Sequence, residues 1–298
     1  MIIDWLESMH IDVKVTNNCS KISNLRSTCS ICLETCKYSS ITSIEQSIEI
    51  DSVRCNSCGE CIIACPLSAI TGATTGREFE QSSLIYKDVI TPTVKELLIY
   101  NKRGIKTIQI GQSTLNQQWE TILNKTNEIL ECMGLSPINV VQKSNEDKLT
   151  RRAFFTSVQR EGKQLTKSMT PTSWRMEAGE WKIANYYHDY QFYTVDIDNQ
   201  KCSLCKACIS FCSEAVFSQV DSFLQIDHEK CVNCHSCRDI CPEQAIQIKP
   251  EIKVKNQTNI TFQQKECCVC GKTFSTFQPD REKCHICINR DPEWLSPF

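Results

Sequence analysis

The sequence lacks long apolar segments, a secretory start and the glycine motifs that bind phosphates. Its best apolar runs, residues 61–65 and 97–100, are far shorter than the roughly 18 residues that cross a membrane. Residues 1–7 are acidic and lack the basic start and apolar core of a signal peptide. We therefore expect no membrane insertion and a location in the reducing cytoplasm. The patterns G-x-G-x-x-G and G-x-x-x-x-G-K are also absent, which argues against nucleotide binding.

The sequence has no excess of either charge sign, and it contains few glycines and prolines. Lys and Arg number 33 and Asp and Glu 35, so the formal charge is -2 and does not predict a nucleic-acid partner. Glycine and proline occur nine times each and 41% of residues are apolar, which excludes a low-complexity, collagen-like or largely disordered chain. The five histidines are scattered and fit no Ser/His/Asp or Cys/His arrangement. We therefore predict no catalytic residue.

Cysteine, in contrast, is abundant, at 22 of 298 residues. Thiols stay reduced in the cytoplasm, so this count favours metal binding over disulfides. Most of these thiols belong to a repeat. Residues 202–241 contain the spacing C-x2-C-x2-C-x3-C twice, and the same order of cysteines recurs 176 positions earlier in the chain. One position breaks the repeat, because Cys202 corresponds to Arg26 and the nearest spare thiol is Cys19.

The repeated spacing has a specific chemical meaning. Three thiolates separated by two residues each can reach three irons of one [4Fe–4S] cluster, and the fourth, three residues later, reaches a neighbouring cluster. Zinc sites use pairs of cysteines rather than evenly spaced triplets, so zinc is not expected here. Two such runs hold two clusters, and the two copies of the repeat therefore predict four [4Fe–4S] clusters.

Residues 55–66 and 231–242 resemble the bacterial two-cluster ferredoxin module, and the whole chain resembles a polyferredoxin-type electron-transfer protein. The resemblance covers roughly residues 15–75 and 195–250. It implies that each copy forms a ferredoxin-like dicluster module, with four thiolates on each cluster. The implied ligand sets are Cys202, Cys205, Cys208 and Cys241; Cys231, Cys234, Cys237 and Cys212; Cys55, Cys58, Cys61 and Cys36; and Cys29, Cys32 and Cys65.

The last of these sets lacks its fourth cysteine, because Arg26 cannot lose its proton to bind iron. We expect Cys19 to take this place, since the longer loop to Cys29 costs only about 1 kcal/mol in closure entropy. Each module then has eight cysteines for two clusters. The alternative is that Cys19 takes no part, and that a site with three cysteines holds a labile or [3Fe–4S] cluster.

Two cysteine pairs near the C-terminus form a separate motif. Cys267 and Cys270 are followed, after thirteen residues, by Cys284 and Cys287. Paired thiols on two knuckles suit a tetrahedral Zn²⁺ with Zn–S distances of about 2.3 Å. The segment resembles a zinc ribbon, which implies a structural metal. Rubredoxin-like iron, a metal-free segment and the replacement of Cys267 by its neighbour Cys268 are the alternatives.

Residues 76–192 contain a single cysteine, Cys132, which we expect to lie on a helix. The patterns predict strands at 83–87, 105–111 and 137–142, a helix that starts at Thr91 and Pro92, and a helix at 119–133. This order implies a small parallel sheet. The segment faintly resembles the small subunit of certain hydrogenase and heterodisulfide-reductase complexes, which implies a docking platform. Residues 146–165 are expected to form a helix, and a polar linker follows.

The sequence thus predicts an α+β chain of several domains. These are a ferredoxin-like dicluster module at 1–75, a small α/β domain at 76–145, a helix and linker at 146–192, a second dicluster module at 193–251 and a zinc ribbon at 260–298. We expect four [4Fe–4S] clusters and one Zn²⁺.

In function, we expect an electron carrier or electron-transfer subunit rather than a catalyst. It would relay single electrons to or from a redox enzyme or a larger oxidoreductase complex. The alternative is a maturation or insertion chaperone, or a redox-sensing interaction protein, of an oxidoreductase.

Overall fold

The computed structural model describes residues 13–72, 76–143 and 180–288. The chain divides into two compact units, of which the first contains Met1–Thr16, Ile31–Thr42 and Glu49–Tyr186. The second contains Asn17–Ser30, Ser43–Ile48 and Tyr187–Phe298. The helix expected at 146–165 and most of the linker after it lie outside the described residues, as do both chain ends. Within the described ranges, every helix is too short or too polar to span a bilayer.

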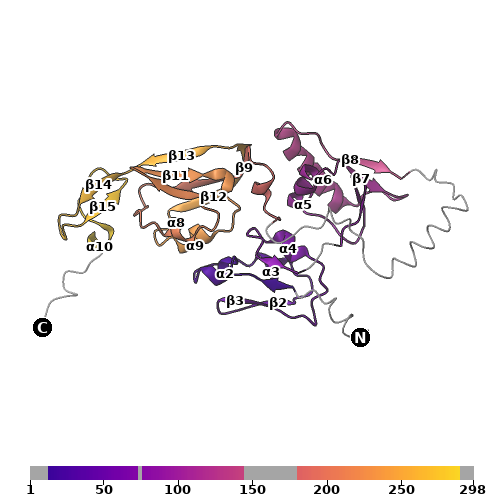
Figure 1. Ribbon diagram of the computed structural model, residues 1–298, viewed down its shortest axis with the longest axis horizontal. Coiled ribbons are helices and arrows are strands. Elements are labelled where there is room, and N and C mark those ends of the chain that lie inside the picture. The colour runs from indigo at the N-terminus through magenta and orange to yellow at the C-terminus, as the bar shows by residue number, and fades with distance from the viewer. Residues whose placement is uncertain (1–12, 73–75, 144–179, 289–298) are drawn as a thin grey trace, which may run out of the picture. The chain divides into compact units, whose positions relative to one another are not determined.

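Residues 79–142 form a small α/β layer structure in the first unit (Figure 1). Its sheet has the strand order β5–β6–β7–β8, made of Phe79–Glu80, Ser83–Ile85, Thr107–Ile110 and Asn139–Gln142. β6, β7 and β8 are parallel, which confirms the predicted parallel sheet. The crossovers between them contain helices α5 (Val94–Lys102) and α6 (Gln117–Cys132), and Cys132 is helical as expected. β5 adds an antiparallel edge strand that the sequence pattern did not predict.

Helix α5 begins two residues later than the sequence predicted. Its N-cap is Thr93 rather than Thr91, because Thr93 and Glu96 form a reciprocal capping box. The backbone N–H of Glu96 donates to Thr93 Oγ1 at 3.1 Å, and the backbone N–H of Thr93 donates to Glu96 Oε2 at 3.3 Å. The residues that follow bury an apolar face against the sheet. The most deeply buried side chains of this part are Leu84, Leu97, Leu98, Ile99, Tyr100, Ile105, Ile108, Trp119, Leu130 and Ile138.

The rest of the first unit surrounds the earlier cysteines. Strand β1 (Lys14–Val15) pairs with β4 (Ile70–Thr71) in antiparallel fashion, and helices α3 (Ile31–Thr35) and α4 (Glu60–Ala64) pack together. The chain between them forms strands β2 (Ile41–Ile44) and β3 (Ser47–Ile50), of which residues Ser43–Ile48 are counted with the second unit. All of these elements are short, because most backbone in this part is used to place thiols rather than to extend a sheet.

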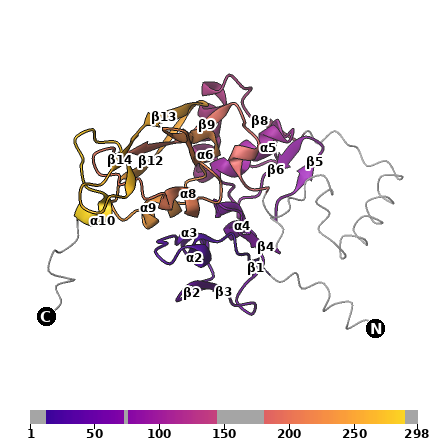
Figure 2. The ribbon, with the colours of Figure 1, turned by 60° about the vertical axis from the view of Figure 1, so that its left-hand side comes forward.

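The second unit is built on two antiparallel sheets, both visible in Figures 1 and 2. One pairs β9 (Tyr190–Ile197) with β12 (Ile246–Val254), and the other has the order β10–β11–β13, formed by Phe217–Val220, Phe223–Asp227 and Gln257–Thr261. Helices α8 (Ala207–Phe211) and α9 (Ser236–Ile240) connect the strands. The core includes Val195, Phe217 and Ile226 together with the thiols of Cys231 and Cys237. Two predicted ligand thiols are therefore part of the apolar interior.

Two smaller segments complete the second unit. Strands β14 (Gln263–Glu266) and β15 (Thr273–Thr276) form a hairpin, and the short helix α10 (His285–Ile288) follows it. The segment Asn17–Ser30, with helix α2 (Ser20–Ser23), contacts α9. The backbone N–H and hydroxyl of Thr28 donate to Asp239 Oδ2 at 2.7 and 2.9 Å, and Asn24 Nδ2 donates to the carbonyl of Ser236 at 3.2 Å.

Candidate cluster and metal centres

The thiols of Cys202, Cys205, Cys208 and Cys241 line one pocket in the second unit. Loop residues before α8 present the first two, and Cys241 follows directly after α9. The remaining walls are largely apolar and include Leu204, Ile209 and Phe262. Burial, together with the neighbouring charges of Cys202, Cys205 and Cys241, raises the pKa of Cys208 to about 12.

The second group in this unit contains Cys212, Cys231, Cys234 and Cys237. Burial raises the pKa of Cys231 to about 12 and that of Cys234 to about 11, and the charge of Cys212 contributes to both shifts. The pKa of Cys237 is raised by burial and by all three partners, and also by Cys208 of the first group. The two groups therefore adjoin each other.

In the first unit, Cys36, Cys55, Cys58 and Cys61 share a pocket in the same way. Burial raises the pKa of Cys61 to about 12, and the other three thiols and Cys32 add to the shift. Such thiols are protonated at neutral pH when they are alone, and they become good ligands when a metal replaces their protons. The donor chemistry of these three groups thus fits an iron–sulfur cluster.

The backbone around the second cysteine of these runs has a shared left-handed turn. The residue before it has positive φ, namely Ser57, Leu204 or Asn233, at 54 to 57°. The residue after it, Gly59, Lys206 or His235, also has positive φ, at 62 to 77°. Left-handed turns point successive N–H groups to one side, where they can bind a negative charge. This conformation costs a non-glycine residue on the order of 1 kcal/mol, and such strain is typical of functional sites.

A second turn follows the last cysteine of every run. Three residues after Cys36, Cys65, Cys212 and Cys241, a residue again has positive φ: Ser39, Ser68, Ala215 and Gln244, at 48 to 51°. The next backbone N–H then donates to the cysteine sulfur, at 3.3 Å from Ala69 and at 3.4 Å from Val216 and from Ala245. In the run of Cys36, the backbone of Ser40 helps to lower the pKa of the thiol. Three of the four runs therefore present their last sulfur to a backbone N–H donor, and the fourth ends in the same turn.

The set predicted from Cys19, Cys29, Cys32 and Cys65 stays a prediction. Cys32 and Cys65 belong to the first unit and Cys19 and Cys29 to the second. The loop from Cys19 to Cys29 folds back on itself: Ser27 Oγ donates to Ser20 Oγ at 3.1 Å, and the backbone N–H of Cys29 donates to Ser27 Oγ at 3.4 Å. Arg26 is exposed in this loop, as expected of a residue that takes no part in ligation.

The C-terminal cysteines form a much more compact group than the repeats do. One ligand atom from each of Cys267, Cys270, Cys284 and Cys287 lies within 4.8 Å of the others, and residues 13–72, 76–143 and 180–288 contain no second group of His, Cys, Asp and Glu this tight. The sulfurs of Cys270 and Cys284 are 3.9 Å apart. A tetrahedral metal with bonds of about 2.3 Å needs sulfurs about 3.8 Å apart. The group thus fits a single metal ion, whereas the wider groups suit clusters with several irons.

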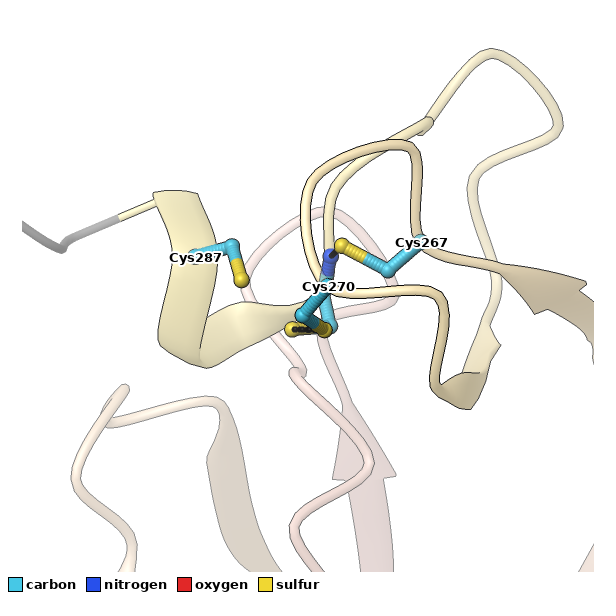
Figure 3. A group of neighbouring side chains, drawn as sticks. Cys267, Cys270 and Cys287 are labelled. Atoms are coloured by element: carbon cyan, nitrogen blue, oxygen red, sulfur yellow. Dashed lines mark hydrogen bonds between the residues drawn. The ribbon is translucent and has the colours of Figure 1, made fainter.

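Figure 3 shows how the fold assembles this group: α10 carries Cys287, which faces the turn that carries Cys267 and Cys270. The backbone N–H of Cys284 donates to Cys267 Sγ at 3.3 Å, and this bond, with further hydrogen bonds from Cys270 and Val269, lowers the pKa of Cys267 to about 6. Gly271, at φ 67°, closes the first knuckle by donating its N–H to the carbonyl of Cys267 at 2.9 Å. Cys268 is exposed and lies outside the group. Cys267, rather than its neighbour, is therefore the candidate ligand.

Sequence reasoning missed one side chain that contacts a candidate ligand. The hydroxyl of Ser40 lies 3.1 Å from Cys36 Sγ. Ser40 occupies the position that the repeat offset assigns to Val216, and comparing the residues between the cysteines, as well as the cysteines, would have shown the difference.

Comparison with known proteins agrees with part of this picture. Residues 48–71 and 224–247 match the family described as 4Fe-4S binding domain. These matches cover the second run of each repeat copy, with Cys55 to Cys65 and Cys231 to Cys241. Comparison with curated proteins gave no match. The chain thus contains two 4Fe-4S binding domains, which indicate an iron–sulfur electron-transfer protein, and a further candidate metal centre near its C-terminus.

Proposed function

We propose that the protein relays single electrons through four [4Fe–4S] clusters to or from a redox enzyme, either as a free carrier or as a subunit. The observation that carries this proposal is the repeated sulfur environment: four runs end in the same turn, and three of them make the same N–H···S hydrogen bond. The adjoining thiol groups of the second unit also suit a relay, because electrons pass between close centres. Cys202, Cys205, Cys208 and Cys241 would hold one cluster and Cys212, Cys231, Cys234 and Cys237 the next.

In the other repeat copy, Cys36, Cys55, Cys58 and Cys61 would hold a cluster, and Cys19, Cys29, Cys32 and Cys65 the fourth. A bound [4Fe–4S] cluster supplies one-electron chemistry without a bond change in a substrate. The chain's own residues fix the sulfurs, exclude water with apolar walls such as Leu204 and Phe262, and donate backbone N–H groups to sulfur. Burial and these hydrogen bonds set the reduction potentials.

The C-terminal group would hold one structural Zn²⁺, because four thiolates leave a tetrahedral metal no open position. The second knuckle, Cys284-His285-Ile286-Cys287, also lacks the Pro-x-Cys-Gly pattern that would favour rubredoxin-like iron. Such a metal would stabilise the hairpin β14–β15 rather than exchange electrons.

Charge indicates what kind of partner would dock. The polypeptide has a formal charge of -2. An oxidised cluster core with four thiolates contributes roughly -2, so four clusters bring the loaded protein to about -10 before zinc. We therefore expect a redox partner that presents a basic surface, with association rates that fall as the salt concentration rises.

The test is metal analysis of the full chain purified without oxygen. We expect about sixteen irons and one zinc per chain, with broad absorption that dithionite bleaches and reoxidation restores. About eight irons would mean that half of the proposed sites are empty, and would overturn the four-cluster proposal.

In the same analysis, Cys19→Ala should lose about four irons or gain a [3Fe–4S] resonance signal when oxidised. The matched control is Cys132→Ala, which alters an isolated exposed thiol and should change neither measurement.

A further inference from the structure

The last cysteines of the four runs have the same backbone environment but not the same side-chain environment. The residue that follows each of them by four positions is Ala69, Val216 or Ala245 in three runs and Ser40 in the run of Cys36. The three apolar residues offer the sulfur only a backbone N–H. Ser40 offers its backbone N–H and also its hydroxyl, whose oxygen lies 3.1 Å from Cys36 Sγ.

The direction of this hydrogen bond follows from the chemistry of the sulfur. A cysteine that ligates iron is a thiolate and has no proton to donate. The hydroxyl of Ser40 must therefore donate to Cys36 Sγ. Ser40 is only 2% exposed, so its hydroxyl is shielded from bulk water. Burial alone would raise the pKa of Cys36, but the hydroxyl and backbone of Ser40, together with the backbone of Tyr38 and Ile41, lower the pKa below its ordinary value.

A hydrogen bond to a ligand sulfur favours the more negative, reduced state of an iron–sulfur centre and thereby raises its reduction potential. We propose that Ser40 is a tuning residue that raises the reduction potential of the cluster at Cys36, Cys55, Cys58 and Cys61 above that of the other clusters. This inference rests on the proposed function, because it needs a cluster at those four thiols.

The test is a redox titration of the full chain, followed by paramagnetic resonance. Ser40→Ala removes the hydroxyl and leaves the backbone N–H. Because the bond is stronger to the more negative, reduced cluster, its loss should lower the equilibrium constant for reduction by up to about tenfold. For a one-electron couple this equals a fall of about 59 mV in one midpoint. The midpoint that moves should be the highest of the four in the unaltered protein.

Ala245→Ser is the reciprocal variant, since it adds a hydroxyl at the same position beside Cys241. It should raise one midpoint of the second unit and leave the iron content unchanged.

Unchanged midpoints in a fully loaded Ser40→Ala protein would overturn the inference, and so would an equal shift of all midpoints. Iron loss confined to Ser40→Ala would also overturn it, because Ser40 would then act on cluster binding. Low iron or irreversible reduction in the unaltered chain would instead overturn the proposed function.

Discussion

His228 is a buried ring that the fold requires to be neutral. It is 3% exposed, and its Nδ1 accepts the backbone N–H of Val195 at 3.1 Å, so the proton of the ring lies on Nε2, which donates to Thr258 Oγ1 at 2.8 Å. Burial lowers the pKa of His228, and the positive charge of Lys253 adds to this effect. Protonation of Nδ1 would also break the bond to Val195.

The sign of the pH dependence follows from this lowered pKa. Below the unfolded pKa, about 6.5, the unfolded chain binds a proton that the folded chain does not. We expect the free energy of unfolding of the second unit to stay constant above that pH and to fall by up to about 1.4 kcal/mol per pH unit below it. Denaturant unfolding between pH 7.5 and 5.5, monitored by circular dichroism, measures this slope. His228→Gln should flatten it, while the exposed His188→Gln should leave it unchanged; equal slopes in all three proteins would contradict the prediction.

For single residues, features that depend on neighbours in the sequence could be predicted, whereas contacts between distant residues could not. The spacing of the cysteines predicted short loops that bring neighbouring thiols such as Cys202, Cys205 and Cys208 into one pocket, whereas the assignment of thiols to four clusters stays a prediction. The role of Ser40 needs a turn conformation that the cysteine pattern does not encode. The role of His228 depends on Val195, which lies 33 positions earlier on strand β9. No local pattern connects these two residues.

Between elements, a buried ion cluster links α4 to α5 in the first unit. Arg77 Nε and Nη2 donate to Glu96 at 2.6 and 2.8 Å, and Nη2 also reaches Glu60 at 3.3 Å. The Arg77 and Glu96 side chains are 3% and 0% exposed. Glu60 stands directly before Cys61, so this cluster connects a candidate ligand loop with the α/β part of the same unit.

Replacing Arg77 with Met should therefore destabilise the first unit by about 3–5 kcal/mol, because Glu96 is left as a buried charge without its partner. The matched control is Lys87→Met, which breaks an ion pair of the same length, 2.6 Å to Glu78, between exposed side chains. That change should cost no more than about 1 kcal/mol. Thermal unfolding of both variants gives the comparison. Similar losses in the two proteins would show that Arg77 does not have the proposed structural role.

The elements around this cluster show which signals in the sequence are sufficient. Helices α5 and α6 and the parallel strands were predicted from their apolar periodicity. The start of α5 was predicted two residues too early. Thr93 and Glu96 have the spacing of a capping box, but Thr91 and Pro92 gave a competing start signal. Strand β5 has only two residues, too few for any alternation to be visible.

In the whole molecule, the division into units differs from the order of the repeats along the chain. The first copy of the cysteine repeat contributes Asn17–Ser30 to the second unit. This placement depends on contacts such as that of Thr28 with Asp239, 211 positions away. Local sequence patterns predict elements and ligand motifs, but they carry no information about a contact between residues so far apart in the chain. The copy in which Arg26 stands where a cysteine is expected is also the copy whose residues are divided between the two units.

The hairpin β14–β15 and helix α10 should depend on metal for their folding, and the rest of the second unit should not. A two-stranded hairpin is marginal by itself, and a bound metal provides the folding free energy of such a segment. Cys284→Ser should therefore lose the zinc and expose residues 263–288 to hydrogen exchange, while β13 stays protected through its pairing with β11. Cys268→Ser, at the neighbouring thiol outside the group, should keep both metal and protection.

Because the cluster thiols lie in other pockets, the iron content and redox midpoints of Cys284→Ser should equal those of the unaltered protein. Loss of cluster absorption together with zinc would show instead that the metal also supports the second unit, whose pocket wall includes Phe262 next to the hairpin.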